Sequence, residues 1–292
     1  MEALVREVVD GMGLMPWSRS RRWGRAVWVC GALLLMGCGQ GPAGEAVGRG
    51  ASKEVRGEAR ACDRGNRLAC TNLAMRFVEG DGVTQDLSRA MQWLSVGCGA
   101  DAPMACVSLA RLRAAGGERE GARAAWRVAC GAGFWVGCNE LAGHLLDGTP
   151  SEVDAAEGHR LLQMTCGRSE LDGCRRLANL LLDERVAPTD AAEGRELLRT
   201  TCLRGHARAC YDWGVLRLAM AGEDEAEVGG ALENLREACV DQVAEACLRL
   251  VQLIEEDDRV PEDSARVRRL LFMACELGDA GACSRFAEGG RP

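Results

Sequence analysis

The chain has 292 residues, of which 47% are hydrophobic and 4% aromatic, and its formal net charge is −7. Residues 1–37 contain five arginines and three acidic residues, so the rest of the chain carries 31 basic and 40 acidic side chains. This acidic balance argues against nucleic-acid binding, which needs a basic face. Lys53 is the only lysine. Because arginine cannot act as a Schiff-base amine, Schiff-base chemistry could occur only at Lys53.

The N-terminal segment has the order of a secretory signal peptide. Basic residues occupy 17–25, and an 11-residue apolar run follows at 26–36, which is too short for an ordinary membrane-spanning helix. Residues 35–38 (LMGC) resemble a bacterial lipobox, which implies that Cys38 is lipidated and begins the mature chain. Plain cleavage nearby, which would leave Cys38 free, is the alternative. The start of translation stays open among Met1, Met12 and Met15.

These features predict three segments and an envelope location. We expect a lipoprotein signal peptide at 1–37, a flexible Gly-rich tether at 38–58 and a folded repeat domain at 59–292. The lipobox resemblance also implies sorting to the outer membrane, because the residue after the cysteine is Gly39 rather than aspartate. The protein is therefore expected to be exported and held at the membrane only by an N-terminal lipid.

Fourteen of the sixteen cysteines form seven pairs, in which the second cysteine follows the first by eight positions. The first members recur every 32 to 37 residues, which indicates a repeat protein. An even, regular set in an exported chain predicts structural disulfides, and pairing within each unit closes the shortest loops. The expected pairs are Cys62 with Cys70, Cys98 with Cys106, Cys130 with Cys138, Cys166 with Cys174, Cys202 with Cys210, Cys239 with Cys247, and Cys275 with Cys283.

Metal binding is the alternative for these cysteines. Zinc sites normally use ligands separated by two to four residues, and the sequence contains no Cys-x-x-Cys. The three histidines, His144, His159 and His206, do not neighbour one another. We therefore expect no metal and seven short disulfide loops, each contributing roughly 2–3 kcal/mol before strain.

Each unit is predicted to hold two helices. A large apolar residue and a small residue stand three and four positions after each second cysteine, and all three share one face of a helix, helix A. A second amphipathic segment, helix B, precedes each first cysteine. An acidic residue lies twelve positions before six of the first cysteines, and we expect it to cap helix B. These acidic residues are Asp86, Glu118, Asp154, Asp190, Glu227 and Asp263.

Residues 80–94 (GDGVTQDLSRAMQWL) resemble the Sel-one-like repeat (SLR), a relative of the tetratricopeptide repeat. With a cysteine pair at each repeat junction, residues 59–289 are similar to the Helicobacter cysteine-rich protein family and to a cysteine-rich mitochondrial relative. Only the first unit keeps the Gly-x-Gly loop, so loop chemistry is not carried over to the others. The resemblance implies an all-α fold, a right-handed α/α solenoid of about seven hairpins with a groove, each hairpin stapled by one disulfide.

The resemblance also implies a scaffold that binds a protein, a peptide or a cell-wall ligand in its concave groove. Candidate groove positions lie two and five residues after the second cysteine on helix A, and Tyr211 is added as an exposed aromatic. For each of them, an ordinary solvated helix face is the alternative. The candidates are Asn72, Ser108, Arg111, Glu140, Arg176, Asn179, Tyr211, Asp212, Arg249 and Gln252.

A β-lactamase or penicillin-binding hydrolase, a label that some cysteine-rich relatives carry, is the alternative function. Serine enzymes of that class need Ser-x-x-Lys, Ser-Asp-Asn and Lys-Thr-Gly, but Gly50 stands three residues before Lys53 and the other two motifs are missing. The sequence therefore names no catalytic residue and favours a scaffold over an enzyme. Haem, suggested by the mitochondrial relative, has little support from scattered histidines and methionines, and no cofactor is expected.

Overall fold

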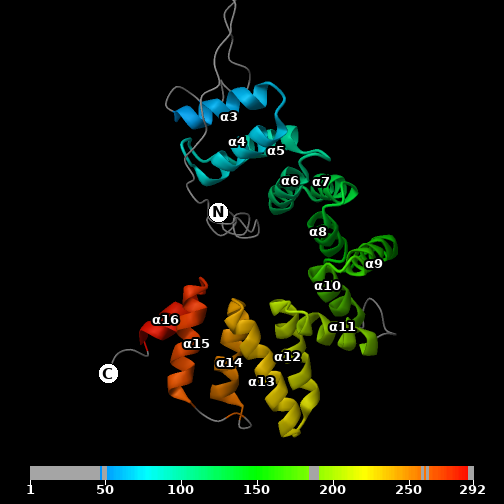
Figure 1. The fold of residues 1–292 in the computed structure, drawn as a ribbon, viewed down its shortest axis with the longest axis vertical. Helices are drawn as coiled ribbons and strands as arrows, with labels where there is room; N and C mark the ends of the chain where they lie inside the picture. The colour runs from blue at the N-terminus through cyan, green and yellow to red at the C-terminus, as the bar shows by residue number, and fades with distance from the viewer. Residues whose placement is uncertain (1–46, 48–50, 184–190, 258–259, 261–262, 289–292) are drawn as a thin grey trace, which may run out of the picture. The chain divides into compact units, whose positions relative to one another are not determined.

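The computed structural model describes residues 47, 51–183, 191–257, 260 and 263–288, in which helices follow one another and no strand occurs (Figure 1). The predicted signal peptide and Cys38 lie outside these residues. The helices are α3 (Lys53–Asp63), α4 (Arg67–Glu79), α5 (Leu87–Gly97), α6 (Pro103–Ala115), α7 (Arg119–Gly131), α8 (Trp135–Leu145), α9 (Glu152–Gly167), α10 (Leu171–Leu182), α11 (Ala191–Leu203), α12 (Ala207–Ala221), α13 (Glu225–Val240), α14 (Ala244–Glu256), α15 (Ser264–Glu276) and α16 (Ala280–Glu288).

Backbone contacts divide the chain into two compact units, unit 1 (1–141) and unit 2 (142–292), with the division inside α8. Within each unit, a helix packs mainly on the helices next to it in the chain. The odd-numbered helices end near a first cysteine and are the predicted B helices, and the even-numbered ones carry a second cysteine and are the A helices. Because contacts lie mainly between helices that are neighbours in the chain, the arrangement is that of an all-α solenoid, as predicted.

All seven predicted disulfides are present, which confirms the pairing within each unit. Each bond joins the end of a B helix to the first turn of the following A helix, with Cα atoms 4.4 to 4.8 Å apart. These bonds exclude the fourteen sulfurs as thiolate ligands for a metal. The bonded pairs are Cys62 with Cys70, Cys98 with Cys106, Cys130 with Cys138, Cys166 with Cys174, Cys202 with Cys210, Cys239 with Cys247, and Cys275 with Cys283.

Six of the seven stapled turns share one backbone conformation. In the first, the N–H of Gly65 donates to the carbonyl of Cys62 at 2.8 Å, and the N–H of Asn66 donates to the carbonyl of Ala61 at 3.1 Å. This pair of bonds is the Schellman ending of a helix, which needs a left-handed residue third after the first cysteine. The residues at that position, all with positive φ, are Gly65, Gly133, Ser169, Gly205, Gln242 and Gly278.

The turn between Cys98 and Cys106 is the exception. Cys98 leaves α5 in an extended conformation, and Gly99 and Ala102 form an isolated antiparallel bridge. Pro103 occupies the first position of α6, where its missing N–H leaves no helical hydrogen bond unmade. This A helix therefore begins with a proline. Other A helices, such as α4 and α12, begin after a left-handed turn residue and a residue whose side chain caps the helix.

Of the six acidic residues predicted to cap the B helices, Asp190 lies outside the described residues, and two of the other five act as caps. Asp86 and Asp263 are the N-caps of α5 and α15, and each accepts the N–H three residues on, at 2.9 and 2.8 Å. Glu118 holds the N-cap position of α7 without a side-chain bond. Asp154 and Glu227 lie one turn further, because a serine or an aspartate three residues earlier is the cap. Those two carboxylates stand near the positive end of the helix dipole instead.

The core contains the predicted large and small positions of the A helices together with apolar residues of the B helices, such as Leu94 and Leu235. Leu73 and Ala74 of α4 are fully buried, whereas Trp213, the corresponding large residue of α12, is partly exposed. Small residues let helices approach closely. A methyl group added at Gly194 of α11 would lie 2.9 Å from the carbonyl oxygen of Ala178 on α10. The glycine is therefore a packing requirement of this helix pair.

The predicted tether, 38–58, is too long at its C-terminal end. Ser52 accepts the N–H of Val55 and caps α3, which begins at Lys53, so residues 53–58 are helical. Val55 and Ala59 are fully buried, and this apolar spacing gives the segment a helix that packs on α4. Among the described residues, no helix has the length and apolar character needed to cross a membrane.

Candidate functional site

The predicted groove positions on the A helices contact one another across repeats. In unit 1, Arg111 stands five residues after the second cysteine of α6, and its Nη2 lies 3.2 Å from Oε1 of Glu140, two residues after the second cysteine of α8. Their side chains are only 18% and 25% exposed. In unit 2, Asn179 of α10 and Asp212 of α12 have the same relation and are bonded at 2.8 Å. The two predicted positions therefore form rungs between adjacent A helices.

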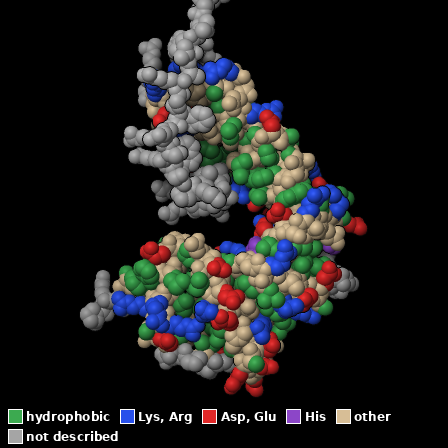
Figure 2. Space-filling view, in the orientation of Figure 1, with side chains coloured by type: hydrophobic (Ala, Val, Ile, Leu, Met, Phe, Trp, Pro, Cys, Tyr) green, Lys and Arg blue, Asp and Glu red, His purple; other side chains and the backbone are tan. Residues whose placement is uncertain are grey.

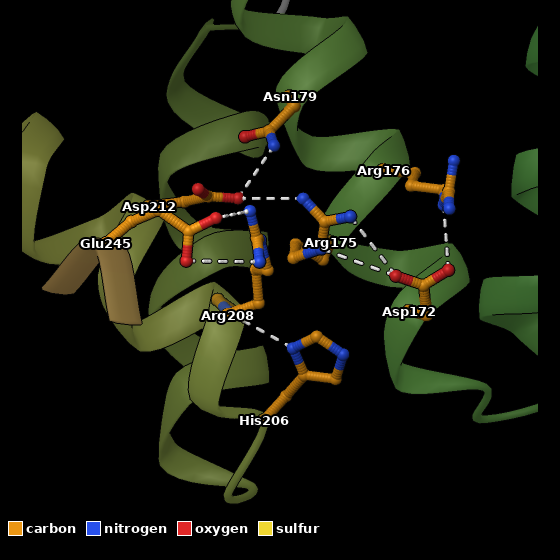
Figure 3. Close-up of polar contacts among 9 residues, drawn as sticks. Asp172, Arg175, Arg176, Asn179, His206, Arg208, Asp212 and Glu245 are labelled. Atoms are coloured by element: carbon orange, nitrogen blue, oxygen red, sulfur yellow. Dashed lines mark hydrogen bonds and ion pairs between the residues drawn. The ribbon is translucent and has the colours of Figure 1, made fainter. Parts of the chain in front are cut away.

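Asp212 is the centre of the largest such cluster (Figure 3). Its Oδ2 accepts hydrogen bonds from Nδ2 of Asn179 at 2.8 Å and from Nη1 of Arg175 at 3.0 Å, and both donors belong to α10. Arg175 also donates Nη2 to Oδ1 of Asp172 at 3.2 Å, and Nε of Arg176 donates to Oδ2 of Asp172 at 2.7 Å. Arg175 thus joins two carboxylates, one on its own helix and one on the next, and fixes the offset of α10 against α12.

Further rungs continue through unit 2. Arg208 of α12 holds Glu245 of α14 with Nη2 and Nη1 at 2.6 and 3.4 Å, as Figure 3 shows. Arg285 of α16 reaches both oxygens of Glu255 on α14 at 2.8 Å. We call the side chains of the rungs in unit 2 and the A-helix positions beside them the helix-A face. It is a row of alternating guanidinium and carboxylate groups that the fold holds in place.

The charge on Asp172 is secured by its arginines. Burial acts to raise the pKa of this carboxyl, but the charges and hydrogen bonds of Arg176 and Arg175 outweigh it, so the pKa of Asp172 lies below the usual range for aspartate. The carboxylate stays ionised through the physiological range. The cluster therefore presents a fixed pattern of charge rather than a proton donor.

His206 serves as the N-cap of α12. Its Nδ1 accepts the N–H of Ala209 at 3.1 Å, which requires the neutral ring. Burial lowers the pKa of His206 below the ordinary histidine value, and Arg175 acts in the same direction, while Asp172 and Asp212 oppose the shift. The residue is therefore structural in this fold, and its neutral form is the native one.

The other predicted groove residues differ in their surroundings. Ser108 is buried, with 1% of its surface exposed, so it is not accessible as a groove contact. Tyr211 is also corrected, because it is half-buried and packs on the core of unit 2. Asn72 is exposed. On α14, Arg249 donates to Gln252 at 2.6 Å, and Gln252 in turn donates to Glu256 at 2.8 Å.

Several rung residues escaped the sequence prediction although the register held a signal. Arg208 and Glu245 both stand two positions before the second cysteine, in successive repeats, and their charges are opposite. A comparison of charges at equal register would have identified this pair. Arg175 had no such signal, because its partner Asp212 lies one position away in register.

One group among the described residues brings three potential metal-ligand atoms together. Cys202, Cys210 and Glu237 place their sulfur and oxygen atoms within 4.8 Å of one another. The two sulfurs are bonded to each other in the fifth staple, so neither is available as a thiolate. This group is accounted for by the disulfide.

The fold resembles that of solved SLR structures. A Sel1 repeat protein from Oxalobacter formigenes superposes with a TM-score of 0.59 at 20% identity, covering 79% of this chain and 68% of that one. The chain has the Sel1-like repeat fold. No family model matches its sequence, and no curated protein matches it either. The Sel1-like assignment thus rests on the structure.

Two further Sel1-like structures are similar to smaller degrees. A protective antigen of uropathogenic Escherichia coli with an SLR fold gives a TM-score of 0.44 at 20% identity, covering 79% of this chain and 58% of that one. A Sel1 repeat protein from Klebsiella pneumoniae gives 0.39 at 16% identity, covering 81% of this chain and 99% of that one.

Proposed function

We propose that the protein is an exported, lipid-anchored repeat scaffold whose helix-A face binds a protein or peptide partner. The observation that carries the proposal is the row of cross-repeat rungs, in which Arg175 and Asp212 are 15% and 18% exposed and have fixed partners. Groups ordered before binding spare the complex part of the entropy cost of fixing side chains. A solenoid with such a row presents an extended, preorganised polar surface.

Parts of this row remain accessible to a partner. The side chains of Arg208 and Glu245 are 50% and 49% exposed, although they hold each other. Gln252 is exposed and lies between Arg249 and Glu256. Alternating donors and acceptors at the spacing of successive A helices suit an extended polypeptide, whose backbone offers both kinds of group.

Affinity capture from solubilised cell envelope tests the partner. The oxidised chain is the bait, and the reduced chain is the first control. The variant Arg249→Ala with Gln252→Ala should lose the partner retained by the wild type, whereas Arg160→Ala, on the B helix α9, should retain it. Equal retention by both variants, or retention by the reduced chain, would contradict a helix-A binding face.

The envelope location is a separate part of the proposal. It is supported by the basic and apolar residues that precede Cys38 and by the seven disulfides, which form in oxidising compartments. The variant Cys38→Ser should move the protein from the membrane fraction to the soluble periplasmic fraction. Unchanged membrane retention would contradict a lipid anchor.

No observation on the described residues favours the hydrolase alternative. His206, the histidine beside the rung cluster, is occupied as a helix cap. Turnover of a chromogenic β-lactam by the oxidised chain, lost when the chain is reduced, would nevertheless replace the scaffold proposal with an enzymatic one.

A further inference from the structure

The last helix pair, α15–α16, carries an apolar pocket with a volume of about 560 Å³. Its lining residues are Ala265, Arg268, Arg269, Phe272, Met273 and Phe286. The rings of Phe272 and Phe286 have centroids 5.4 Å apart, and the guanidinium of Arg268 lies 5.5 Å from the centre of the Phe286 ring. A pocket of this size accommodates one large side chain and its neighbours.

Phe272 is an aromatic residue at a repeat position that is polar in most other B helices. It stands three positions before the first cysteine of its staple and is 47% exposed. Six B helices precede α15, and five of them have a polar residue at this position, whereas α3 has the buried Ala59. The polar residues are Ser95, Arg127, Gln163, Arg199 and Arg236. An exposed aromatic ring at a position that is polar and exposed in α5, α7, α9, α11 and α13 indicates a binding surface.

Phe286 is partly accessible for a related reason. It holds the large apolar position of helix A, where Leu73 and Leu250 are fully buried. Among the described residues, no further B helix follows α16 to cover it, and Phe286 is only partly buried. The rings of Phe272 and Phe286 are therefore both accessible at the surface of this helix pair.

The rim of the pocket is basic in a chain that is acidic overall. Arg268 and Arg269 belong to the lining, and neither forms an ion pair with a carboxylate in the part of the chain that the structure describes. Arg285 nearby differs, because Glu255 holds it. Figure 2 shows basic side chains beside hydrophobic ones over α15 and α16. The pocket therefore lacks the negative charge that would complement its two rim arginines.

We propose that this pocket, the terminal pocket, binds an acidic peptide segment that places one aromatic side chain in the pocket, against the paired rings of Phe272 and Phe286. Carboxylates flanking the inserted residue would pair with Arg268 and Arg269. A second copy of the chain meeting the pocket with its own pocket would bring these arginines against their counterparts, which like-charge repulsion opposes. The terminal pocket is tested at residues of α15 and the helix-A face at residues of α14, so either proposal can fail without the other.

Fluorescence anisotropy tests the proposal on the oxidised full chain. The probe is a fluorescein-labelled peptide in which one tryptophan is flanked on both sides by acidic residues. It should bind saturably, and a peptide with serine in place of tryptophan should bind at least about tenfold more weakly, since buried aromatic anchors dominate such interfaces. Replacing the acidic residues by glutamines should weaken binding and remove most of its salt dependence.

Matched variants locate the site. Phe272→Gln introduces the residue that α9 has at the same register and should weaken binding about tenfold or more. Arg268→Gln with Arg269→Gln should weaken it and flatten the salt dependence. Val153→Gln replaces a 76% exposed valine on α9 and should leave the affinity unchanged. Circular dichroism and intact disulfides establish that each variant is folded.

Three results would overturn the proposal. The first is no saturable binding of the tryptophan peptide. The second is equal affinity for the wild type and Phe272→Gln, which would place the peptide elsewhere. The third is self-association in sedimentation that Phe272→Gln abolishes while the peptide does not bind, which would assign the pocket to a second copy. In each case, the helix-A proposal would still hold if affinity capture retains a partner on the wild type and loses it on the Arg249→Ala, Gln252→Ala variant.

Discussion

Two of the six similar stapled turns place a side chain where glycine is favoured. Ser169 and Gln242 have φ near +68° and +69°, whereas Gly65, Gly205 and Gly278 fill the same position in other turns. A left-handed conformation costs a non-glycine residue roughly 1–2 kcal/mol. The disulfide and the two Schellman bonds hold the turn in this conformation whichever residue occupies it.

Exchanging the residues at this position should therefore shift stability in opposite directions. Gln242→Gly should raise the free energy of unfolding by up to about 1 kcal/mol, because strain is relieved at some cost in chain entropy. Gly205→Gln should lower it by about 1–2 kcal/mol. Denaturant titration of both variants measures the difference, and equal effects of the same sign would contradict the strained turn.

His206 couples stability to pH. Its folded pKa is lowered, so as pH falls below about 6.5 the unfolded chain binds a proton before the native one does. The stability that neutral His206 contributes is present above that pH and is lost as the pH falls through the folded pKa. His206→Asn keeps a capping oxygen, as Asn66 does for α4, and should remove this dependence.

Unfolding of the wild type and the His206→Asn variant at about pH 7.5 and about pH 5.5 measures the effect. The wild type should lose more stability than the variant on acidification. If both lose the same amount, the histidine is not the group responsible.

At the scale of the element, two helical glycines allow the effect of helix packing on stability to be distinguished from the effect of backbone freedom in the unfolded chain. A methyl at Gly194 would meet Ala178 and Leu182, both at 2.9 Å, whereas a methyl at Gly229 of α13 would meet nothing within 4 Å. Gly194→Ala should therefore destabilise by about 1–3 kcal/mol through overpacking. Gly229→Ala should stabilise by about 0.4–1 kcal/mol, because the unfolded chain loses entropy. Thermal unfolding of the two variants checks the sign, and two effects of equal sign would contradict it.

The rungs between A helices should differ in strength with their burial. Arg175 and Asp212 are 15% and 18% exposed, whereas Arg208 and Glu245 are 50% and 49% exposed. Double-mutant cycles with alanine should give a coupling of about 1–3 kcal/mol for the first pair and below about 1 kcal/mol for the second. High salt should reduce only the second appreciably. The reverse order would contradict burial as the determinant.

At the scale of the whole molecule, seven disulfides of equal loop length stabilise pairs of short helices that would be marginal in isolation. Each loop has the same sequence separation of eight, so the entropy model predicts the same effect for each, roughly 2–3 kcal/mol. Cys239 and Cys247 are buried to the same degree as Cys62 and Cys70. Replacing either pair by alanines should therefore cost about the same in chemical denaturation. A large difference between them would assign the effect to local packing instead of the unfolded chain.

The repeat architecture, the helices and the disulfide pairing could be predicted from the sequence, because all three depend on spacings within one unit. The eight-residue cysteine interval and the apolar face that begins at Cys70, Leu73 and Ala74 are local and recur. The turn residues carried a signal too, in the glycine third after four first cysteines, although Ser169 and Gln242 obscured it.

Only the tertiary structure decided which helix-A residues are partnered. The bond from Arg175 to Asp212 spans 37 positions and depends on the offset between α10 and α12, which side-chain packing sets. For the same reason Ser108, polar and on a predicted groove position, is buried. The terminal pocket around Phe272 likewise depends on how α15 and α16 pack, because its lining comes from both helices. Residue spacing along the chain does not specify that packing.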